Sequence, residues 1–424
     1  MTTVIKGGRI IDATGERTGD VVIDDGVVAA VGPDLSADRV IDASGCVVAP
    51  GLVDLHTHLR EPGKEESETV ETGSRAAALG GYTAVIAMPN TEPAIDCAAV
   101  VREVLELGSK AALVDVRSSG AITVGRKGES LAPMAEMAAL GVRLFTDDGN
   151  GVQDNRLMRR ALEYASGLGV TLAQHCEDDS LSAGGHMNEG AWSSRLGIPG
   201  IPAEAEELMV MRDIALARLT GARIHFQHLS TDGSIAMVRA AKAGGLAITA
   251  EATPHHFTLT DECCASYDPV FKVNPPLRTA ADVAAVKAGL GDGAVDAIAT
   301  DHAPHAQELK EQTFDEAPPG MLGLETALAL GITELDIDLA DLIGLLSWRP
   351  ATIAGLGELH GGPIEVGRPA NLCVIDPSAT WTVDASRLAS RSRNTPFAGR
   401  TLRGRVRHTF LWGELVVLDG EATR

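Results

Sequence analysis

Aromatic side chains are scarce in this chain, because only 3% of its 424 residues are Phe, Trp or Tyr although 45% are hydrophobic. The core must therefore be packed from Ala, Val, Leu and Ile, and the length allows one large domain or two. Long apolar runs are also missing. No segment offers the 18 apolar residues of a membrane helix, and the first residues lack the apolar run of a signal peptide. We expect a cytoplasmic protein that does not bind membranes.

Positive charge is in short supply. The chain has 36 Lys and Arg against 58 Asp and Glu, which gives a formal net charge of -22. A chain this acidic repels nucleic acid and anionic membrane surfaces, so we expect neither as a partner. An anionic small substrate would also be repelled unless a cation is placed locally.

Several motifs that mark other classes of protein are absent. The six cysteines form no C-x-x-C pair, and their scatter in a long chain argues against a disulfide scaffold. No G-x-G-x-x-G motif follows a candidate strand. The nearest approach to a P-loop, from Gly120 to Gly125 and followed by Arg126, lacks the required Lys-Ser/Thr. A doubly wound nucleotide-binding sheet is therefore not supported.

Both ends of the chain consist of short strand-like segments. Val21–Ile23 and Val27–Ala29 flank a hairpin signal at residues 24–26, and Asn371–Ile375 is a strand candidate near the other end. Neither end has enough strands for a good sheet alone. We predict that residues 1–50 and 365–424 meet in one small, discontinuous β-sandwich domain, with residues 51–364 inserted between them.

The inserted segment alternates strand-like with helix-like runs, which indicates parallel βα units. Several helix-like runs end at Gly80, Gly108, Gly141, Gly221 or Gly244, where glycine favours a helix stop. The strand candidates are Leu52–Leu59, Thr83–Met88, Ala112–Val116, Val142–Thr146, Val170–His175, Ile224–His228, Ala247–Ala250 and Asp296–Ala299. Eight such units predict an α/β fold of the (β/α)8 TIM-barrel type.

The first of these strands carries the most informative pattern. Alternate residues of a strand share a face, so His56 and His58 should point the same way, with Arg60 following at the strand's end. Two imidazoles on a rigid strand make half of a metal site, although a pair of ordinary buried histidines would give the same pattern.

The other strand ends supply further polar residues. In a barrel of this type the carboxyl ends of the strands meet at one face and form the active site. The candidate metal ligands at those ends are His56, His58, Asp148, His175, His228 and Asp301, with Asp147 as an alternative to Asp148. Nitrogen and oxygen ligands without thiolate suit Zn²⁺, and six ligands exceed what one tetrahedral zinc needs. We therefore expect one or two zinc ions, with two favoured, and hydrolytic chemistry at a carbonyl or phosphoryl centre.

Two segments carry a family resemblance. Residues 54–63, with the sequence DLHTHLREPG, and residues 299–305, with the sequence ATDHAPH, resemble the two signatures of the dihydroorotases, which belong to the amidohydrolase superfamily. The chain as a whole resembles the longer bacterial class of that family, nearly from end to end. The segments 88–91, 145–149, 274–278 and 318–320 add to the match.

This resemblance implies a role for each candidate. It implies that His56, His58 and Asp301 hold one zinc, that His175 and His228 hold the other, and that Asp148 bridges the two ions. It further implies that Asp301 is the catalytic acid–base, that Arg60, Asn90 and His305 bind the substrate carboxylate, and that Asn274 and the backbone at Pro319 and Gly320 contact the ring. His255 and His256 are interpreted as structural, because the ligand set is already complete.

The implied reaction is the reversible closure of N-carbamoyl-L-aspartate to dihydroorotate, the third step of pyrimidine synthesis. A homodimer and an association with aspartate carbamoyltransferase are further expectations. One alternative is another cyclic amidase: dihydropyrimidinases, hydantoinases and allantoinases share the histidine pattern but bridge their metals with a carboxylated lysine. Here Asp147 and Asp148 stand at that position, and no lysine does. A non-catalytic scaffold is the second alternative, but such a protein would be expected to lose the metal ligands.

Overall fold

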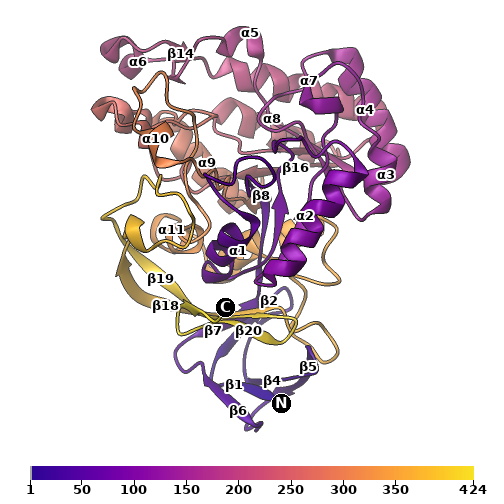
Figure 1. The fold of residues 1–424 in the computed structure, drawn as a ribbon, viewed down its shortest axis with the longest axis vertical. Coiled ribbons are helices and arrows are strands. Elements are labelled where there is room, and N and C mark those ends of the chain that lie inside the picture. Colours follow the sequence, from indigo (N-terminus) through magenta and orange to yellow (C-terminus); the bar gives the residue numbers. More distant parts are fainter. Residues whose placement is uncertain (1) are drawn as a thin grey trace.

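Strands from both ends of the chain lie side by side at one end of the molecule (Figure 1). The computed structural model describes residues 2–424. One sheet has the order β21-β20-β19-β18-β7-β2-β3, and a second has the order β5-β4-β1-β6. Their strands are β1 (Thr3–Lys6), β2 (Arg9–Asp12), β3 (Gly15–Thr18), β4 (Asp20–Asp24), β5 (Val27–Gly32), β6 (Arg39–Asp42), β7 (Val47–Pro50), β18 (Leu372–Thr382), β19 (Thr401–Leu411), β20 (Glu414–Leu418) and β21 (Glu421–Ala422).

The hairpin predicted around residues 24–26 is present in the four-stranded sheet. β4 and β5 form an antiparallel hairpin, in which Asp25 and Gly26 take the positive φ values that its tight turn requires. β7 from the N-terminal part pairs antiparallel with β18 from the C-terminal part, with Val48 opposite Val374. Each end of the chain therefore completes a sheet that the other end begins.

One buried apolar cluster joins the two sheets. Ile5 and Val21 of the four-stranded sheet pack with Ile10, Val48 and Phe410 of the seven-stranded sheet, and all five are buried. Burial of apolar surface between the sheets stabilises the meeting of the two chain ends.

Parallel strands alternate with helices through the middle of the chain. One parallel sheet has the order β10-β9-β8, and another has the order β11-β12-β15-β16-β17. The strands are β8 (Leu52–Thr57), β9 (Tyr82–Ala87), β10 (Asp115–Ser118), β11 (Leu144–Phe145), β12 (Thr171–Gln174), β15 (Ile224–Phe226), β16 (Ile248–Ala252) and β17 (Ala297–Ile298). All eight predicted strands have a counterpart here, and a short pair, β13 (Met187–Asn188) with β14 (Gly200–Ile201), lies outside them.

Isolated bridges link the edges of the two parallel sheets. Gly120, just after β10, bridges in parallel to Phe145 of β11, and Thr57 of β8 bridges in parallel to His302, just after β17. The eight strands therefore follow one another from neighbour to neighbour in chain order, and the last returns to the first.

Helices connect these strands and pack around them (Figure 1). They are α1 (Val70–Leu79), α2 (Ala98–Ala111), α3 (Met134–Ala139), α4 (Asn155–Leu168), α5 (Asp179–Ser182), α6 (Ala191–Leu196), α7 (Glu204–Thr220), α8 (Asp232–Ala243), α9 (Ala280–Asp292), α10 (Gln307–Lys310), α11 (Ala327–Glu334), α12 (Leu339–Leu346) and α13 (Trp348–Ile353). Within residues 2–424, none of the helices combines the length and the apolar character that crossing a membrane requires.

Some predicted element ends are wrong, two of them for clear local reasons. Gly80, Gly221 and Gly244 do end helices, but Gly108 lies inside α2. A Cβ on Gly108 would stand 2.4 Å from the Cβ of Val116, so the glycine lets the helix approach its strand. The third strand begins at Asp115 rather than Ala112, because Ala112 takes a left-handed conformation that ends α2.

Candidate active site

The candidate site residues gather where the parallel strands end. They border a cavity of about 230 Å³. Its lining comprises His58, Arg60, Asn90, Asp148, Gly149, His175, His228, Val273, Asn274, Asp301, Ala303, His305, Pro319 and Gly320. Every site residue predicted from the sequence is in this lining except His56, which is fully buried beneath it.

His56 and His58 share one side of the chain at the end of β8, as the alternation predicts. Their ring centroids are 5.2 Å apart. The Nε2 atom of His56 lies 3.2 Å from Oδ1 of Asp148, and the Nε2 atom of His58 lies 3.6 Å from Oδ2 of the same carboxylate. The strand itself ends at Thr57, so His58 stands one residue beyond it.

The second pair of histidines lies next to the same carboxylate, at the ends of two other strands. His175 follows β12 and His228 follows β15. Nδ1 of His175 lies 3.4 Å and Nε2 of His228 lies 3.5 Å from Oδ1 of Asp148, and these two nitrogens are 2.9 Å apart. Asp148 therefore stands in contact distance of all four imidazoles.

The donor atoms fit a metal centre. Two groups, His56 with His58 and Asp148, and Asp148 with His175 and His228, each bring their ligand atoms within 4.8 Å of one another. Ligands of one tetrahedral zinc lie roughly 3.3 Å apart, given Zn–N bonds of about 2.0–2.1 Å. Nε2 of His56 and Oδ1 of Asp148 are buried without a hydrogen-bond partner, which an ion between them would supply. These residues can therefore hold metal.

The electrostatics of the cluster favour a cation. Burial alone would lower the pKa of His56, but Asp148 and Asp301 raise it well above its usual value. Burial alone would raise the pKa of Asp148, but His56 and the neighbouring histidines hold it well below its usual range. The two carboxylates are thus ionised and attract positive charge to this point.

The neighbouring Asp147 is turned away from the histidines. Its Oδ1 accepts hydrogen bonds from the backbone N–H groups of Ile122 and Thr123, at 2.8 and 3.0 Å. Asp147 therefore fixes the loop that follows β10, while Asp148 faces the cluster.

Asp301 lies at the edge of the cluster, after β17. Its Oδ1 is 3.0 Å from Nε2 of His58 and 3.5 Å from Nε2 of His56. Burial alone would raise its pKa, but His56 and His58 hold it well below its usual range. Asp301 is therefore an ionised carboxylate that borders the cavity.

Two acceptors orient the imidazoles of the first strand. His58 Nδ1 donates to Oδ1 of Asn90 over 2.9 Å, and His56 Nδ1 donates to Oε1 of Glu251 over 2.9 Å. Each bond leaves the Nε2 lone pair directed at the cluster. Glu251 is absent from the sequence-based set. Its one signal is that it is the only charged residue within the buried part of β16.

Arg60 brings positive charge to the lining of the same cavity. The residue is 8% exposed, and its Nε donates to the carbonyl of Pro304 over 3.0 Å. Within residues 2–424 no carboxylate oxygen lies within 4.0 Å of its guanidinium nitrogens. Burial lowers the pKa of Arg60 to about 10, which still leaves it charged at neutral pH.

His305 and the backbone beyond it complete this side of the cavity. Nε2 of His305 donates to the carbonyl of Pro319 over 2.8 Å. Burial and the charge of Arg60 lower the pKa of His305 to about 2, so the ring is neutral. The ammonium of Lys310 donates to the carbonyls of Pro318 and Gly320, at 3.0 and 3.2 Å, and so secures the loop.

Asn274 and two further histidines stand on the remaining side. The side-chain amide nitrogen of Asn274 is 3.4 Å from Nε2 of His175, and its Oδ1 is buried without a partner. His256 bonds to Thr253 and to the carbonyl of Pro275, which fits its structural interpretation. Neither His256 nor His255 lines the cavity.

Three of these residues adopt strained backbone conformations. Arg60, His228 and Asp301 have φ values of 62°, 31° and 44°, in the left-handed region that non-glycine residues rarely adopt. Such strain costs about 1–3 kcal/mol per residue and clusters at functional sites. The surrounding packing holds these three side chains at the cavity at the expense of stability.

Comparisons with known proteins agree with this geometry. A family model described as "Dihydro-orotase-like" matches residues 45–234. The chain is 50% identical to the dihydroorotase of Streptomyces coelicolor and 51% identical to that of Mycobacterium tuberculosis, and each alignment covers 99% of both chains.

Solved structures of similar shape come from related enzymes. An L-hydantoinase (dihydropyrimidinase) from Arthrobacter aurescens superimposes with a TM-score of 0.89 at 25% identity, covering 100% of this chain and 97% of the other. The dihydropyrimidinase from Brevibacillus agri gives a TM-score of 0.87 at 24% identity, with coverage of 100% and 96%, and so supports the fold alone.

Proposed function

The chain belongs to the dihydroorotase family, and we propose that it catalyses the reversible, metal-dependent closure of N-carbamoyl-L-aspartate to (S)-dihydroorotate. That reaction is the third step of pyrimidine synthesis. The observation that carries the proposal is the position of Arg60, a buried guanidinium without a carboxylate partner among residues 2–424, in the cavity that the histidine cluster also lines. A substrate with a cyclic amide and a carboxylate offers one group to the cluster and the other to the guanidinium.

The donor set is proposed to hold two zinc ions. His56, His58 and Asp301 would hold one ion, His175 and His228 the other, and Asp148 would bridge them, since its two oxygens lie within 3.2–3.6 Å of all four imidazoles. When bound, these ions supply a Lewis acid that polarises the amide carbonyl and activates a water.

Arg60 is proposed to bind the substrate carboxylate together with Asn90 and His305. The guanidinium is fixed through its Nε by Pro304, and one outer nitrogen lies 3.5 Å from Nε2 of His305. No carboxylate among residues 2–424 engages the outer nitrogens, which can form two parallel hydrogen bonds to a substrate carboxylate. The neutral His305 adds no competing charge. Asn274 and the backbone at Pro319 and Gly320 border the space left for the ring.

Asp301 is proposed to move the proton. Its carboxylate is ionised and borders the cavity, so it can accept a proton from the attacking water and return it to the ring nitrogen that leaves. In the direction of synthesis, the same group takes the proton from the carbamoyl nitrogen as the ring closes.

The related cyclic amidases are the nearest alternative, because hydantoinase structures superimpose over the whole chain. Of the residues that the structure describes, no lysine lines the cavity, and Asp148 lies within 3.2–3.6 Å of all four imidazoles. Neutral hydantoin rings would also leave the Arg60 guanidinium without an anion. Both observations favour dihydroorotate over hydantoin.

The test is a substrate panel run on purified protein with its metal content measured. We expect hydrolysis of dihydroorotate and closure of carbamoyl aspartate, with little or no turnover of hydantoin and allantoin. We also expect between one and two zinc ions per chain, loss of activity on chelation, and recovery on adding zinc. Preferred hydrolysis of hydantoin, or full activity in metal-free protein, would contradict the proposal.

We propose the matching architecture as well. The neighbour-to-neighbour order of the eight parallel strands, and the bridge from Thr57 back to His302, support a closed (β/α)8 barrel over residues 51–364. The apolar cluster between the two terminal sheets supports a β-sandwich domain built from residues 1–50 and 365–424.

A further inference from the structure

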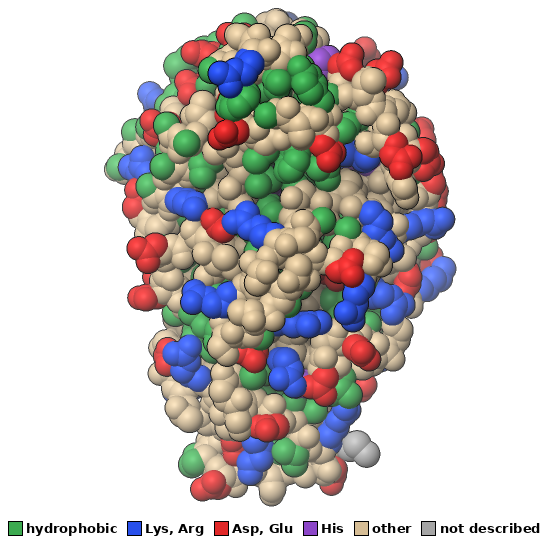
Figure 2. All heavy atoms as spheres, turned by 90° about the vertical axis from the view of Figure 1, so that its left-hand side faces the viewer, with side chains coloured by type: hydrophobic (Ala, Val, Ile, Leu, Met, Phe, Trp, Pro, Cys, Tyr) green, Lys and Arg blue, Asp and Glu red, His purple; other side chains and the backbone are tan. Residues whose placement is uncertain are grey.

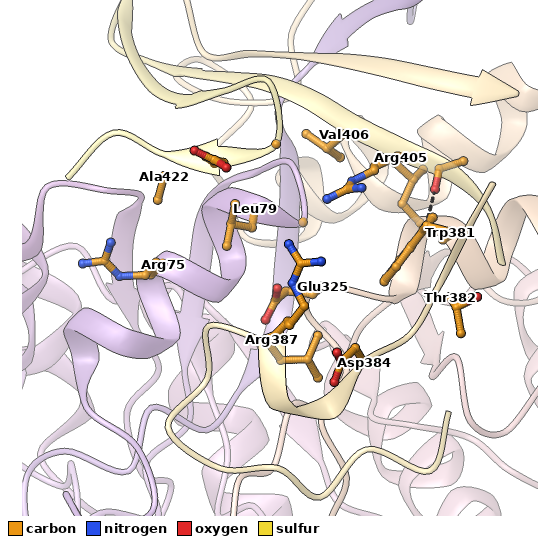
Figure 3. A pocket seen from close by; sticks show the side chains of 17 residues that line it. Arg75, Leu79, Glu325, Trp381, Thr382, Asp384, Arg387, Arg405, Val406 and Ala422 are labelled. Atoms are coloured by element: carbon orange, nitrogen blue, oxygen red, sulfur yellow. Dashed lines mark hydrogen bonds between the residues drawn. The ribbon is translucent and has the colours of Figure 1, made fainter. Parts of the chain in front are cut away.

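A second cavity, of about 520 Å³, shares no lining residue with the candidate active site. It lies where α1 and α11 face β18, β19 and β21 (Figure 3). Cavities of about 300–1,000 Å³ are typical of sites for small molecules. Nothing in the proposed reaction uses this one.

The chain next to this cavity reverses the overall charge of the protein. Residues 385–407 contain seven arginines and no Asp or Glu, in a chain whose net charge is -22. Figure 2 shows basic side chains gathered over the middle of the face that carries β18 and β19. Some are neutralised: Arg400 pairs with Glu334, and Arg407 pairs with Asp419.

Two of the seven arginines line the cavity without such a partner. Among residues 2–424, neither Arg387 nor Arg405 has an ion pair within 4.0 Å or a hydrogen bond from its guanidinium. Figure 3 shows both guanidinium groups pointing toward the middle of the cavity from different sides. Arg75, at the rim, is already engaged by Glu71.

The lining also contains acidic groups, although within residues 2–424 no ion pair shorter than 4.0 Å joins them to Arg387 or Arg405. Asp384 accepts hydrogen bonds from the backbone and hydroxyl of Ser386, at 3.0 and 2.7 Å, and these bonds together with the charge of Arg387 lower its pKa. Glu325 accepts from the backbone N–H of Ala389, and burial raises its pKa to about 7. Near neutral pH a protonated Glu325 could donate a hydrogen bond to an oxyanion. Glu421 is exposed at the edge.

The indole of Trp381 forms a fixed wall beside these groups. Its Nε1 donates to the carbonyl of Gly404 over 2.9 Å, and the guanidinium carbon of Arg405 lies 5.9 Å from the ring centroid. The wall therefore combines an apolar surface with a positive charge held over it.

We propose that this cavity is a binding site for a small phosphorylated metabolite, whose phosphate is held between Arg387 and Arg405 and whose remaining part packs on Trp381. Two guanidinium forks from separate segments suit the several oxygens and the double charge of a phosphate group. A hollow of about 520 Å³ suits a small molecule better than a nucleic acid or a membrane surface, both of which need an extended basic face.

Calorimetric titration of the zinc-loaded protein with inorganic phosphate tests the proposal. We expect saturable binding by wild-type protein and at least about tenfold weaker binding by the double variant Arg387→Gln/Arg405→Gln, because each removes charge-assisted hydrogen bonds. Arg195→Gln is the matched control, since Arg195 also lies over an indole, that of Trp192, outside the cavity. This control should bind as wild type does.

Two further measurements separate this site from other sources of binding. Arg60→Met should leave phosphate affinity unchanged, whereas binding at the candidate active site would weaken. Dihydroorotate hydrolysis by the double variant should equal that of wild type, and this result would show that the double variant folds. If the proposed function is wrong, this activity assay fails for both proteins, whereas the calorimetric result is unaffected. The proposal is overturned if wild-type protein does not bind, if the double variant binds equally well, or if the double substitution changes the oligomeric state, which would identify the arginines as partner contacts.

Discussion

Glu251 accepts hydrogen bonds from two buried imidazoles, over 2.9 Å from Nδ1 of His56 and 2.9 Å from Nε2 of His225. Burial alone would raise the pKa of Glu251, but these two histidines lower it to about 2. The carboxylate thus keeps the proton of His56 on Nδ1 and leaves Nε2 free to bind metal.

Glu251→Gln should therefore weaken zinc binding while leaving the fold intact. Glutamine keeps the size and one acceptor but loses the charge that supports His56, and such outer partners typically contribute about 10- to 100-fold in metal affinity. Competition with a chromophoric chelator measures the affinity, and circular dichroism controls for folding. Wild-type zinc affinity in the variant would show that Glu251 serves packing alone.

Substitutions at Asp147 and Asp148 should have different effects, one on stability and the other on metal content. Asp148→Ala removes the carboxylate shared by four histidines, so metal content should fall below that of wild type. Asp147→Ala leaves the buried N–H groups of Ile122 and Thr123 without an acceptor, which should lower the free energy of unfolding by about 1–3 kcal/mol and leave the metal in place. Metal analysis and thermal unfolding of both variants check this. The opposite pattern would show that Asp147, and not Asp148, is the carboxylate that both metal ions share.

The clustering of the histidines could be predicted from the sequence because it depends on two simple regularities. Residues two apart on a strand share a face, which brings His56 and His58 together, and parallel strands bring their ends to one edge, which adds His175, His228 and Asp301. The choice of Asp148 over Asp147 came from a family pattern rather than from either regularity.

Other features depend on contacts between elements that are distant in the sequence, and sequence patterns do not reveal these contacts. Glu251 resembles any other glutamate until β16 is placed beside β15, which carries His225. The loop at Pro318 is secured by an ammonium that binds backbone carbonyls, which every residue possesses. Gly108 is predicted to end a helix because glycine is common at that position. Its observed role depends on its contact with Val116, which lies on a different element and is not apparent from the sequence pattern.

Glu325 should make stability fall as pH rises. Its pKa is raised from 4.5 to about 7, mainly by burial, so between these values the folded state binds more protons than the unfolded state. The contribution of Glu325 to the free energy of unfolding is fully present below about pH 4.5 and is lost as the pH rises through about 7. Glu325→Gln should therefore raise the melting temperature relative to wild type at pH 8 but not at pH 4. Glu414→Gln, on the surface, controls for the loss of charge, and an equal shift at both pH values would contradict the assignment.

Asp301→Asn should abolish most of the activity without unfolding the protein. The amide cannot accept the proton of the attacking water, and general acid–base catalysis is typically worth about 10²–10⁴-fold in rate. The measurement is kcat on dihydroorotate, made alongside metal analysis, because Asp301 also lies 3.0 Å from His58. A variant that keeps its metal and loses less than about tenfold would show that another group carries the proton.

Arg60→Met should impair the enzyme only toward substrates that bear a carboxylate. Arg60 is buried, and no carboxylate oxygen of residues 2–424 lies within 4.0 Å of its guanidinium, so the substrate would supply the missing anion. Truncating one partner of a buried charged pair typically costs about 2–5 kcal/mol, or roughly 30- to 5,000-fold in kcat/KM. We expect that loss on dihydroorotate and on carbamoyl aspartate.

Dihydrouracil, which lacks the carboxylate, provides the matched comparison for Arg60. Its weak turnover should be nearly the same in wild type and variant, because the guanidinium has no group to bind there. Arg60 also donates to the carbonyl of Pro304, so the variant could instead disturb the loop that carries His305. That disturbance would lower turnover of both substrates equally, and an equal loss would therefore show that Arg60 supports the loop rather than selecting the carboxylate.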